Sequence, residues 1–149
     1  MSFLSAFNTS VSGMTAQRQR VNTISENIAN AETTRTPQGG PYRRREVILA
    51  SVANDRTFEE ELLSQDRSVS TSTEVKVVGI VQDERPPILR LEQGHPDANE
   101  EGYVEMPNVN IMEEMVNLMS ANRSYEANTA AFNATKNMVQ SALDLGRNA

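Results

Sequence analysis

The 149-residue sequence contains no cysteine, no tryptophan and a single histidine. The lack of cysteine excludes disulfide scaffolds, thiolate zinc sites and cysteine nucleophiles, and one imidazole is too few for a histidine-rich metal centre. Aromatic residues make up 5% of the chain and hydrophobic residues 38%. This supply of apolar side chains is small for a globular core, so we expect either one domain or one elongated subunit.

Long apolar runs are also missing. No stretch approaches 18 consecutive apolar residues, so we expect no membrane insertion. The first charged residue is Arg18, and no basic segment precedes it. We therefore expect no Sec-type signal peptide, and any export must use a route that does not need one.

The net charge of −6 is unevenly distributed. Residues 1–45 carry six basic and two acidic side chains, whereas residues 46–105 carry five basic and fourteen acidic ones. This separation is compatible with head-to-tail pairing of subunits and also with an ordinary solvated surface. Nucleic-acid binding is not expected, because the chain is acidic and its one arginine run, Arg43–Arg45, is short.

Two segments have a seven-residue apolar period that predicts long helices. The first covers residues 3–29, and its apolar row is Phe7, Met14, Val21 and Ile28. The second covers residues 110–145, and its apolar row is Ile111, Leu118, Tyr125, Phe132 and Val139. In both segments the second heptad row, which lies beside the apolar row on the helix surface, is partly polar. Gly13 weakens the first helix by about 1 kcal/mol relative to alanine.

The second helix has recognisable ends. Asn110 with Glu113 three residues later is typical of a capping box, and Gly146 stands where a C-terminal cap is expected. A helix of this length spans about 54 Å and needs a partner. We therefore predict an α+β protein whose N- and C-terminal helices pack as a coiled-coil-like pair. Two interpretations stay open: a helical hairpin complete in itself, or packing that is completed only when subunits assemble.

The middle of the chain is predicted to be a small β-rich module. Strands are expected at residues 42–50, 75–82, 88–91 and 103–104, antiparallel because the connections offer no convincing crossover helix. Gly79 suggests a bulge, and a short helix is expected at residues 57–63. The chain is thus divided into a helical arm with its connecting loop (1–36), the β-rich module (37–106) and a second helical arm (107–149).

Candidate reactive residues do not form a convincing site. His95, Asp97, Glu100 and Glu101 are close in sequence, but they lie in a turn-rich stretch in which Asp and Asn side chains typically bond nearby backbone amides. Gly39–Gly40–Pro41 is too short for a phosphate loop and precedes a strand. We therefore expect no catalytic, cofactor-binding or metal site, and no enzyme activity.

Several motifs together resemble a known family. They are residues 19–31 (QRVNTISENIANA), 36–45 (TPQGGPYRRR), 94–99 (GHPDAN), 102–104 (GYV), 107–110 (PNVN), 114–119 (EMVNLM) and 121–128 (ANRSYEAN). The combination resembles the bacterial flagellar axial proteins of the rod and hook, and within them the proximal rod branch. Residues 51–85 carry little of this resemblance.

The resemblance implies a structural subunit of the proximal rod, the shaft that transmits motor torque across the periplasm. It implies export through the flagellar type III apparatus without cleavage, and assembly with copies of itself and with other rod proteins. In such proteins the terminal helices form the inner tube and the middle module faces outward. The alternatives are another axial subunit of the same machine, or an enzyme such as one that acts on peptidoglycan.

Combined with the heptad rows, this resemblance suggests which residues pack within or between subunits. They are Phe7, Met14, Val21, Ile28, Asn27, Asn30, Ile111, Met115, Leu118, Tyr125, Phe132 and Val139. Asn27 and Asn30 are expected either to bond across subunits or to lie at a fraying helix end. The methionines Met112, Met115 and Met119 fit either core packing or a surface that adapts to unlike neighbours.

Overall fold

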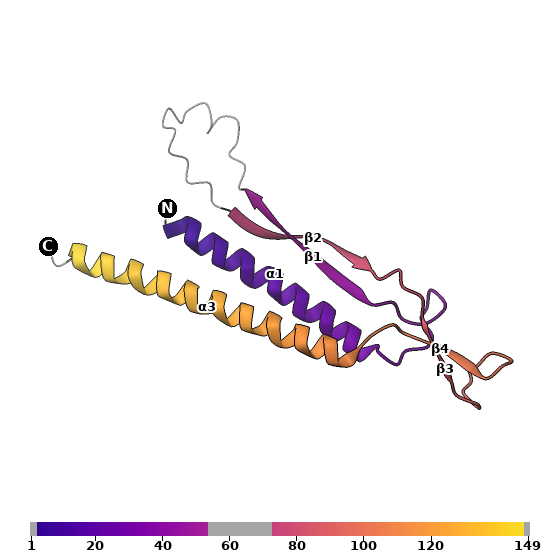
Figure 1. Ribbon diagram of the computed structural model, residues 1–149. Coiled ribbons are helices and arrows are strands. Elements are labelled where there is room, and N and C mark those ends of the chain that lie inside the picture. The colour runs from indigo at the N-terminus through magenta and orange to yellow at the C-terminus, as the bar shows by residue number, and fades with distance from the viewer. Residues whose placement is uncertain (1–2, 54–72, 148–149) are drawn as a thin grey trace, which may run out of the picture.

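A computed structural model of the protein describes residues 3–53 and 73–147 (Figure 1). Its elements are α1 (Phe3–Ala29), β1 (Arg45–Ala53), β2 (Thr73–Gln82), β3 (Ile88–Leu91), β4 (Tyr103–Met106) and α3 (Ile111–Arg147). Two long terminal helices with antiparallel strand pairs between them confirm the predicted α+β class. The short helix expected at residues 57–63 lies outside the described residues.

Helices α1 and α3 lie side by side and run in opposite directions, which brings the two termini to the same end of the molecule (Figure 1). The 27 residues of α1 and the 37 residues of α3 correspond to about 40 Å and 55 Å. The C-terminal part of α3 therefore extends beyond α1. Packing between the terminal helices within one chain confirms the predicted helix pair.

Small side chains occupy the middle of the contact between the helices. Ser10, Gly13 and Ala16 of α1 are buried, as is Ala121 of α3. A Cβ atom added to Gly13 would lie 2.8 Å from Nδ2 of Asn128. Gly13 thus permits a close approach of the helices, which offsets its weak helix propensity.

Enlarging Gly13 should separate the helices. We expect Gly13→Leu to lower the free energy of unfolding by about 1–3 kcal/mol, because overpacking forces backbone shifts. Gly13→Ala combined with Asn128→Ala removes the clash and should gain up to about 1 kcal/mol through helix propensity. Denaturant unfolding followed by circular dichroism measures both variants. Equal stability of Gly13→Leu and the parent chain would contradict the close approach.

Asn110 caps the start of α3, as its place in the predicted capping box requires, but the end of α3 is not capped as predicted. Oδ1 of Asn110 accepts hydrogen bonds from the amides of Met112 (3.1 Å) and Glu113 (3.4 Å). The helix continues through Gly146 to Arg147, and Gly146 does not adopt a positive φ. The prediction that Gly146 is a C-terminal cap was therefore wrong. A glycine inside a helix costs only about 1 kcal/mol, which is too little to stop a helix of this length.

The strands form two separate pairs, not one sheet. The β1–β2 pair is antiparallel, and its register runs from Arg45 opposite Gln82 to Ala53 opposite Thr73. The register shifts where Ile48 faces Gly79 and Leu49 faces Val77, which leaves Val78 as the extra residue of β2. The bulge predicted from Gly79 is therefore present, directly beside that residue. Strand β3 pairs with β4 at the end of the molecule away from the termini (Figure 1).

The first strand begins later than predicted. It starts at Arg45 instead of residue 42, because Tyr42 belongs to the preceding loop: its amide donates to the carbonyl of Thr33 (3.0 Å) and its side chain is buried. The β1–β2 pair lies along α1. Its first β2 residues are held there by the Thr9 hydroxyl, which donates to the Thr73 carbonyl (3.2 Å), and by the Ser12 hydroxyl, which accepts from the Val75 amide (3.2 Å).

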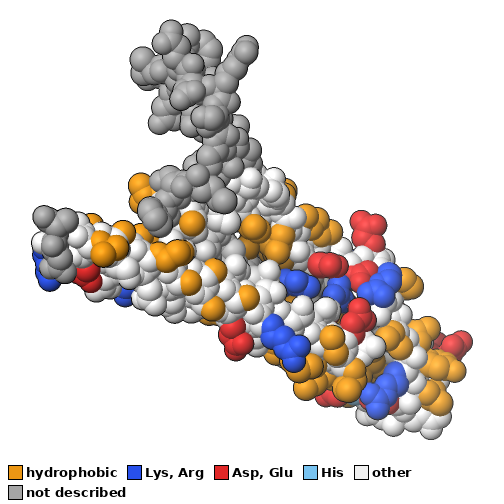
Figure 2. Space-filling model, turned by 60° about the vertical axis from the view of Figure 1, so that its left-hand side comes forward, with side chains coloured by type: hydrophobic (Ala, Val, Ile, Leu, Met, Phe, Trp, Pro, Cys, Tyr) orange, Lys and Arg blue, Asp and Glu red, His pale blue; other side chains and the backbone are white. Residues whose placement is uncertain are grey.

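The hydrophobic core is small. Among the described residues, the buried apolar side chains are Ala16, Ile24, Tyr42, Val104, Pro107 and Ala121. Many larger apolar side chains are exposed, on both helices and on the strands, and Figure 2 shows such side chains spread over the visible face. A chain with so little core and so much apolar surface is suited to burying that surface against other molecules.

Candidate functional site

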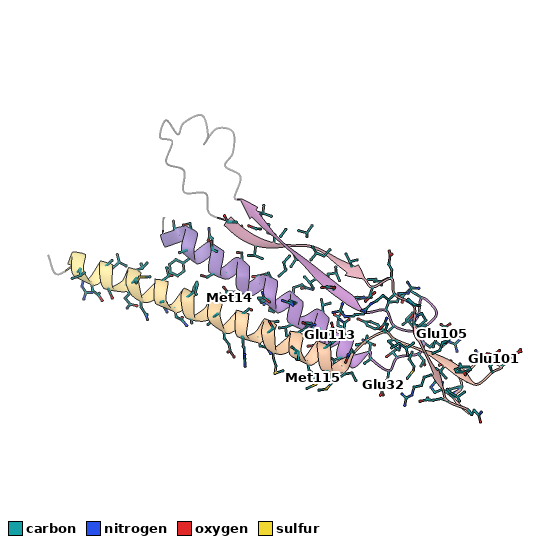
Figure 3. The ribbon with its side chains drawn as sticks, viewed as in Figure 1. Met14, Glu32, Glu101, Glu105, Glu113 and Met115 are labelled. Carbon is teal, nitrogen blue, oxygen red and sulfur yellow. The ribbon has the colours of Figure 1, made fainter. Side chains whose placement is uncertain are left out.

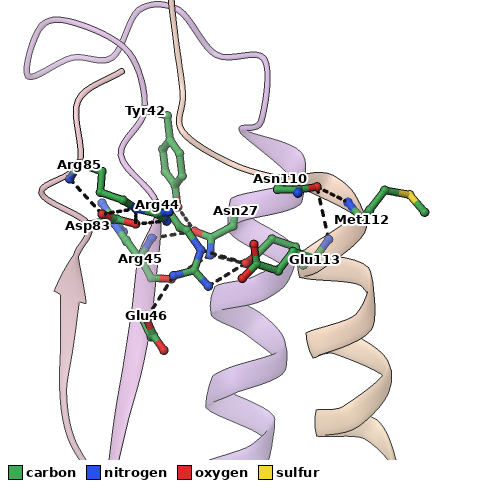
Figure 4. A network of polar contacts seen from close by, with 11 residues as sticks. Asn27, Tyr42, Arg44, Arg45, Glu46, Asp83, Arg85, Asn110, Met112 and Glu113 are labelled. Atoms are coloured by element: carbon green, nitrogen blue, oxygen red, sulfur yellow. Dashed lines mark hydrogen bonds and ion pairs between the residues drawn. The ribbon is translucent and has the colours of Figure 1, made fainter. Parts of the chain in front are cut away.

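Four polar side chains meet inside the molecule where α1 ends, β1 begins and α3 begins (Figure 4). They are Asn27 of α1, Tyr42 and Arg44 of the segment before β1, and Glu114 in the first turn of α3; we call this group the polar junction. Asn27 and Glu114 are 0% and 1% exposed, and the Arg44 side chain is 13% exposed. Such burial of charge and amide groups requires that each be paired.

Every polar atom of the Asn27 side chain is used. Its Nδ2 donates to the Arg45 carbonyl and to Oε2 of Glu114, each at 2.8 Å. Its Oδ1 accepts from the Tyr42 hydroxyl and from the Arg45 amide, each at 2.9 Å. Two donors and two lone pairs are the full capacity of an amide, so Asn27 ties three chain segments together.

Glu114 is held from the other side by Arg44. Nε of Arg44 donates to Oε1 of Glu114 at 2.9 Å, and a second guanidinium nitrogen lies 2.8 Å from the same oxygen. The guanidinium also bonds the exposed Glu46 at 3.1 Å. Burial, the largest single influence, opposes the charged form of Arg44, but the hydrogen bonds and charges of Glu114 and Glu46 together outweigh it and raise the pKa of Arg44. Burial is likewise the main reason that the pKa of Tyr42 is raised.

An ion pair between the exposed Arg85 and the half-buried Asp83 lies beside the junction in Figure 4. Hydrogen bonds from Arg85 hold the pKa of Asp83 at about 2, below its ordinary 3.8. A carboxylate whose pKa falls on folding stabilises the fold above its unfolded-state pKa, and that contribution is lost as the pH falls through the folded-state value. The Asp83–Arg85 pair therefore makes its full contribution above about pH 4 and loses it as the pH falls through about 2.

The sequence cluster around His95 is a network of turns. Nδ1 of His95 accepts from the Asp97 amide (3.1 Å), and the Asp97 carboxylate accepts from the Thr34 hydroxyl (2.8 Å). Asn99 accepts from the amides of Glu101 (3.0 Å) and Tyr103 (2.8 Å). Over residues 3–53 and 73–147, no three histidine or acidic side chains gather as a metal site would require. In the same ranges no helix is apolar and long enough to cross a membrane.

Some of the residues predicted to pack contact the other helix of the same chain, and others are partly exposed. Phe7 meets Phe132 edge to face, with ring centroids 5.0 Å apart, and the Thr129 hydroxyl donates to Sδ of Met14 at 3.4 Å. Val21, Ile28, Leu118 and Val139 are half-buried. Ile111, Met115 and Tyr125 are 42%, 48% and 40% exposed. Within this chain, then, these last three residues keep two fifths to one half of their surface exposed.

Both asparagines are bonded within the chain. Asn27 uses its full hydrogen-bonding capacity there, and bonding of this pair across subunits stays a prediction. Asn30 closes the end of α1: its Nδ2 donates to the Glu26 carbonyl at 2.8 Å, and its Oδ1 accepts from the Thr33 hydroxyl at 3.2 Å. The end of α1 is therefore bonded, not frayed.

The sequence reasoning missed Tyr42, Arg44 and Glu114. A signal existed in the heptad spacing: Glu114, Ala121, Asn128 and Thr135 are seven residues apart, and three of the four are buried on α3. The large apolar residues flank this small and polar row. A glutamate in the first turn of a helix is usually exposed, so this row does not by itself indicate that Glu114 is an interior residue.

Comparison with known families shows the class of protein to which this chain with its terminal helix pair belongs. Residues 7–35 match the family model described as flagella basal body rod protein. Residues 100–145 match the model described as flagellar basal body rod FlgEFG protein C-terminal. The two matches cover most of α1 and α3, and the bond from Asn27 to Glu114 joins them. The class is therefore that of flagellar basal-body rod proteins, whose terminal helices are here locked together.

Individual relatives show to which family of rod proteins the chain belongs. The chain is 42% identical to the flagellar basal-body rod protein FlgC of Borreliella burgdorferi, over 96% of this chain and 97% of that protein. It is 43% identical to FlgC of Bacillus subtilis and 36% identical to FlgC of Salmonella typhimurium, over 99% of this chain and 100% of each relative. The chain belongs to the FlgC family.

Proposed function

We propose that this chain is a structural subunit of the proximal rod of the bacterial flagellum and carries motor torque across the periplasm by packing its terminal helices with those of neighbouring subunits. The observation that carries the proposal is the similarity to FlgC proteins along nearly the whole chain. The exposed apolar side chains of both helices and both strand pairs support it, because they would be buried on assembly. Contacts between unlike patches build open filaments.

In this proposal the polar junction sets the register of α1 against α3. The centre of the helix contact is made of small side chains, which resist sliding less than large interlocking ones. A buried polar group with a unique set of partners fixes register more strongly, as buried asparagines do in coiled coils. A subunit under torque needs such a fixed register, because one-turn slippage would shift every surface contact by about 5 Å.

The partners proposed are copies of this chain, other rod proteins and the flagellar type III export apparatus. A catalytic role is not part of the proposal, because the relatives are named as rod proteins. An assay on purified peptidoglycan should give no hydrolysis, and reproducible hydrolysis would favour the enzyme alternative.

Peptide mass spectrometry of purified hook–basal bodies tests the proposal. Peptides of this chain are expected there, including one that begins at its first residues if export proceeds without cleavage. Deletion of the gene should abolish the rod and motility, and the unmodified chain should restore both. Recovery of the chain only from the cytoplasmic fraction of motile cells would contradict the proposal.

A substitution at Arg43 tests whether the arginine run contacts a neighbouring subunit or only stabilises the fold of its own chain. Arg44 is committed to Glu114, whereas Arg43 is exposed and has no ion pair among the described residues. We expect Arg43→Glu to reduce incorporation into rods while changing the free energy of unfolding by no more than about 0.5 kcal/mol. Quantitative immunoblotting of isolated rods measures incorporation. Unchanged incorporation would remove Arg43 from the interface.

A further inference from the structure

The β1–β2 pair is attached to α1 by a different strand at each of its ends. At the start of β1, the Asn27 side chain bonds both the amide and the carbonyl of Arg45. At the start of β2, the Thr9 and Ser12 hydroxyls bond backbone groups of residues 73–75. The outer edge of β1 therefore faces α1 at one end of the pair, and the outer edge of β2 faces it at the other end.

The twist of the strand pair accounts for this exchange. Two-stranded pairs twist more strongly than larger sheets, and the extra residue Val78 adds to the twist, as bulges do. In Figure 1 the two strands cross one another. Each strand therefore turns one half of its outer edge towards α1 and the other half away from it.

The halves that are turned away have backbone groups without a hydrogen-bond partner among the described residues. In an antiparallel pair, alternate residues direct their N–H and C=O groups out of the ladder. Because Arg45 directs both groups outward, so do Leu49 and Ser51 further along β1. Gln82 is opposite Arg45, so Gln82 and Ile80 do the same on β2. We call the outward groups of Leu49 and Ser51 the β1 free edge, and those of Ile80 and Gln82 the β2 free edge.

The free edges lack the features that block pairing with a further strand. Natural edge strands carry charged residues, proline or a bulge for this purpose. Residues 47–53 of β1 and 79–82 of β2 have none of these. Ile48, Ile80 and Val81 are 47%, 47% and 50% exposed, and side chains stand out from both strands on the side away from α1 (Figure 3). The free edges are therefore open to another strand.

The four charged residues of β1 and β2 all lie in ion pairs within the chain. They are Arg45 with Glu26, Glu46 with Arg44, and Glu74 with Lys76. Asp83 and Arg85, which follow β2, pair with each other. Around the β2 free edge, the charges without an ion pair in the described part of the chain are Glu84, Arg20 and Glu113. The free edges themselves are uncharged, so backbone hydrogen bonds and apolar contact decide which strand fits.

The two free edges complement one another. They lie towards opposite ends of the pair, on strands that run in opposite directions. In two copies that point the same way, β1 of one copy therefore runs antiparallel to β2 of the other. Leu49 can then lie opposite Gln82, and Ser51 opposite Ile80, of the other copy. Each of these opposed pairs exchanges two hydrogen bonds.

We propose that the β1 free edge of one subunit pairs with the β2 free edge of a second copy of this chain. This inference rests on the proposed rod function and names the partner for one of its contacts. A second copy fits because each subunit carries one edge of each kind, and neither is used within its own chain. The contact joins unlike edges, so it repeats from subunit to subunit without closing.

The pairing fixes the displacement between the two copies. Within one chain, Ser51 is opposite Val75, whereas Ile80 is opposite Val47. Bringing Ser51 beside Ile80 of the second copy therefore shifts that copy by four strand residues, which is about 13 Å along the strands.

Disulfide trapping tests the pairing, and the lack of native cysteine makes it specific. Ala50 would lie opposite Val81 of the other copy in a non-hydrogen-bonded pair, whose Cα atoms are about 4.5 Å apart. A disulfide can span this distance. Within one chain Val81 is opposite Glu46 instead, so the same two positions are too far apart to be linked.

Cells without the native gene would express two differently tagged chains, one Ala50→Cys and the other Val81→Cys, and their rods would be isolated and oxidised. A disulfide-linked dimer that carries both tags is expected. Val52→Cys in place of Ala50→Cys moves the thiol by about 7 Å and should give little dimer. Rods that contain both chains without the Ala50–Val81 dimer would overturn the contact and leave the rod function standing. An equal yield with Val52→Cys would overturn the pairing as well.

Proline substitution provides an independent test. Ser51→Pro removes an outward N–H that the β1–β2 ladder does not use. It should lower the yield of trapped dimer about fivefold or more, because one intersubunit hydrogen bond is lost and the ring meets the partner strand. Ser51→Thr keeps the N–H and should leave the yield unchanged. Gln82→Pro should act like Ser51→Pro from the other edge.

Thermal unfolding of the purified chains shows which proline variant folds, and a folded variant decides. An unchanged yield of trapped dimer from a folded proline variant would overturn the pairing. Absence of even the cysteine-free parent from rods would contradict the proposed function and this contact with it.

Discussion

Replacing Glu114 with alanine is expected to lower the free energy of unfolding by about 3–5 kcal/mol, the usual effect of removing one partner of a buried ion pair. The substitution leaves the Arg44 guanidinium buried beside Asn27 without its main counter-charge, and one Asn27 amide hydrogen loses its acceptor. Denaturant unfolding of the purified chain at neutral pH, followed by circular dichroism, measures the loss.

The neighbouring glutamate provides a matched control. Glu113 is exposed and lies one position earlier on the same helix, so Glu113→Ala removes the same charge from the same first turn. Its effect should stay within about 0.5 kcal/mol. The double substitution Arg44→Met with Glu114→Leu should recover more than half of the loss, because apolar pairs of similar volume replace buried ion pairs well. A similar effect of Glu113→Ala and Glu114→Ala would contradict the junction.

Introducing aspartate at both Leu118 and Tyr125 is expected to abolish rod assembly. Leu118 is half-buried and Tyr125 is 40% exposed, so both retain surface that a neighbouring subunit can cover. Burying a large apolar side chain contributes about 1.5–3 kcal/mol, and an unpaired carboxylate in its place adds a desolvation penalty. Motility in soft agar and electron microscopy of basal bodies measure the result.

The matched control adds the same two charges without removing apolar surface. Asn133 and Asn137 are exposed on α3, and Asn133→Asp with Asn137→Asp changes the net charge by the same amount. This chain should still form rods. Functional rods built from the Leu118→Asp, Tyr125→Asp chain would show that these two residues do not contribute to assembly.

The regular parts of the fold were predictable because they depend on local patterns. The seven-residue rows indicated both helices, Asn110 indicated the start of α3, and Gly79 indicated the bulge between β1 and β2. The expected end of α3 at Gly146 failed, because a single glycine does not outweigh the hydrogen bonds of a long helix. The strand expected from Tyr42 began at Arg45, because burial of the tyrosine side chain decided the backbone path.

The polar junction was harder to predict from the sequence than the helices and the bulge. Its members are far apart in the chain: the Asn27–Glu114 bond joins residues 87 positions apart, and Arg44 reaches Glu114 across 70. Glutamate and arginine are mostly surface residues, so their residue types alone give no reason to place Glu114 and Arg44 inside the molecule. Asn27 was singled out, but for intersubunit bonding, because a sequence does not show which partners share its amide.

Electron cryomicroscopy of isolated basal bodies, at a resolution that shows side chains, tests the central claim most directly. The account predicts this chain in the proximal rod, with α1 and α3 of one subunit antiparallel and with Glu114 between Arg44 and Asn27 of that same subunit. A proximal rod without this chain would contradict the assignment. A rod in which Glu114 pairs with Arg44 of a different subunit would contradict the junction as the lock of the helix pair.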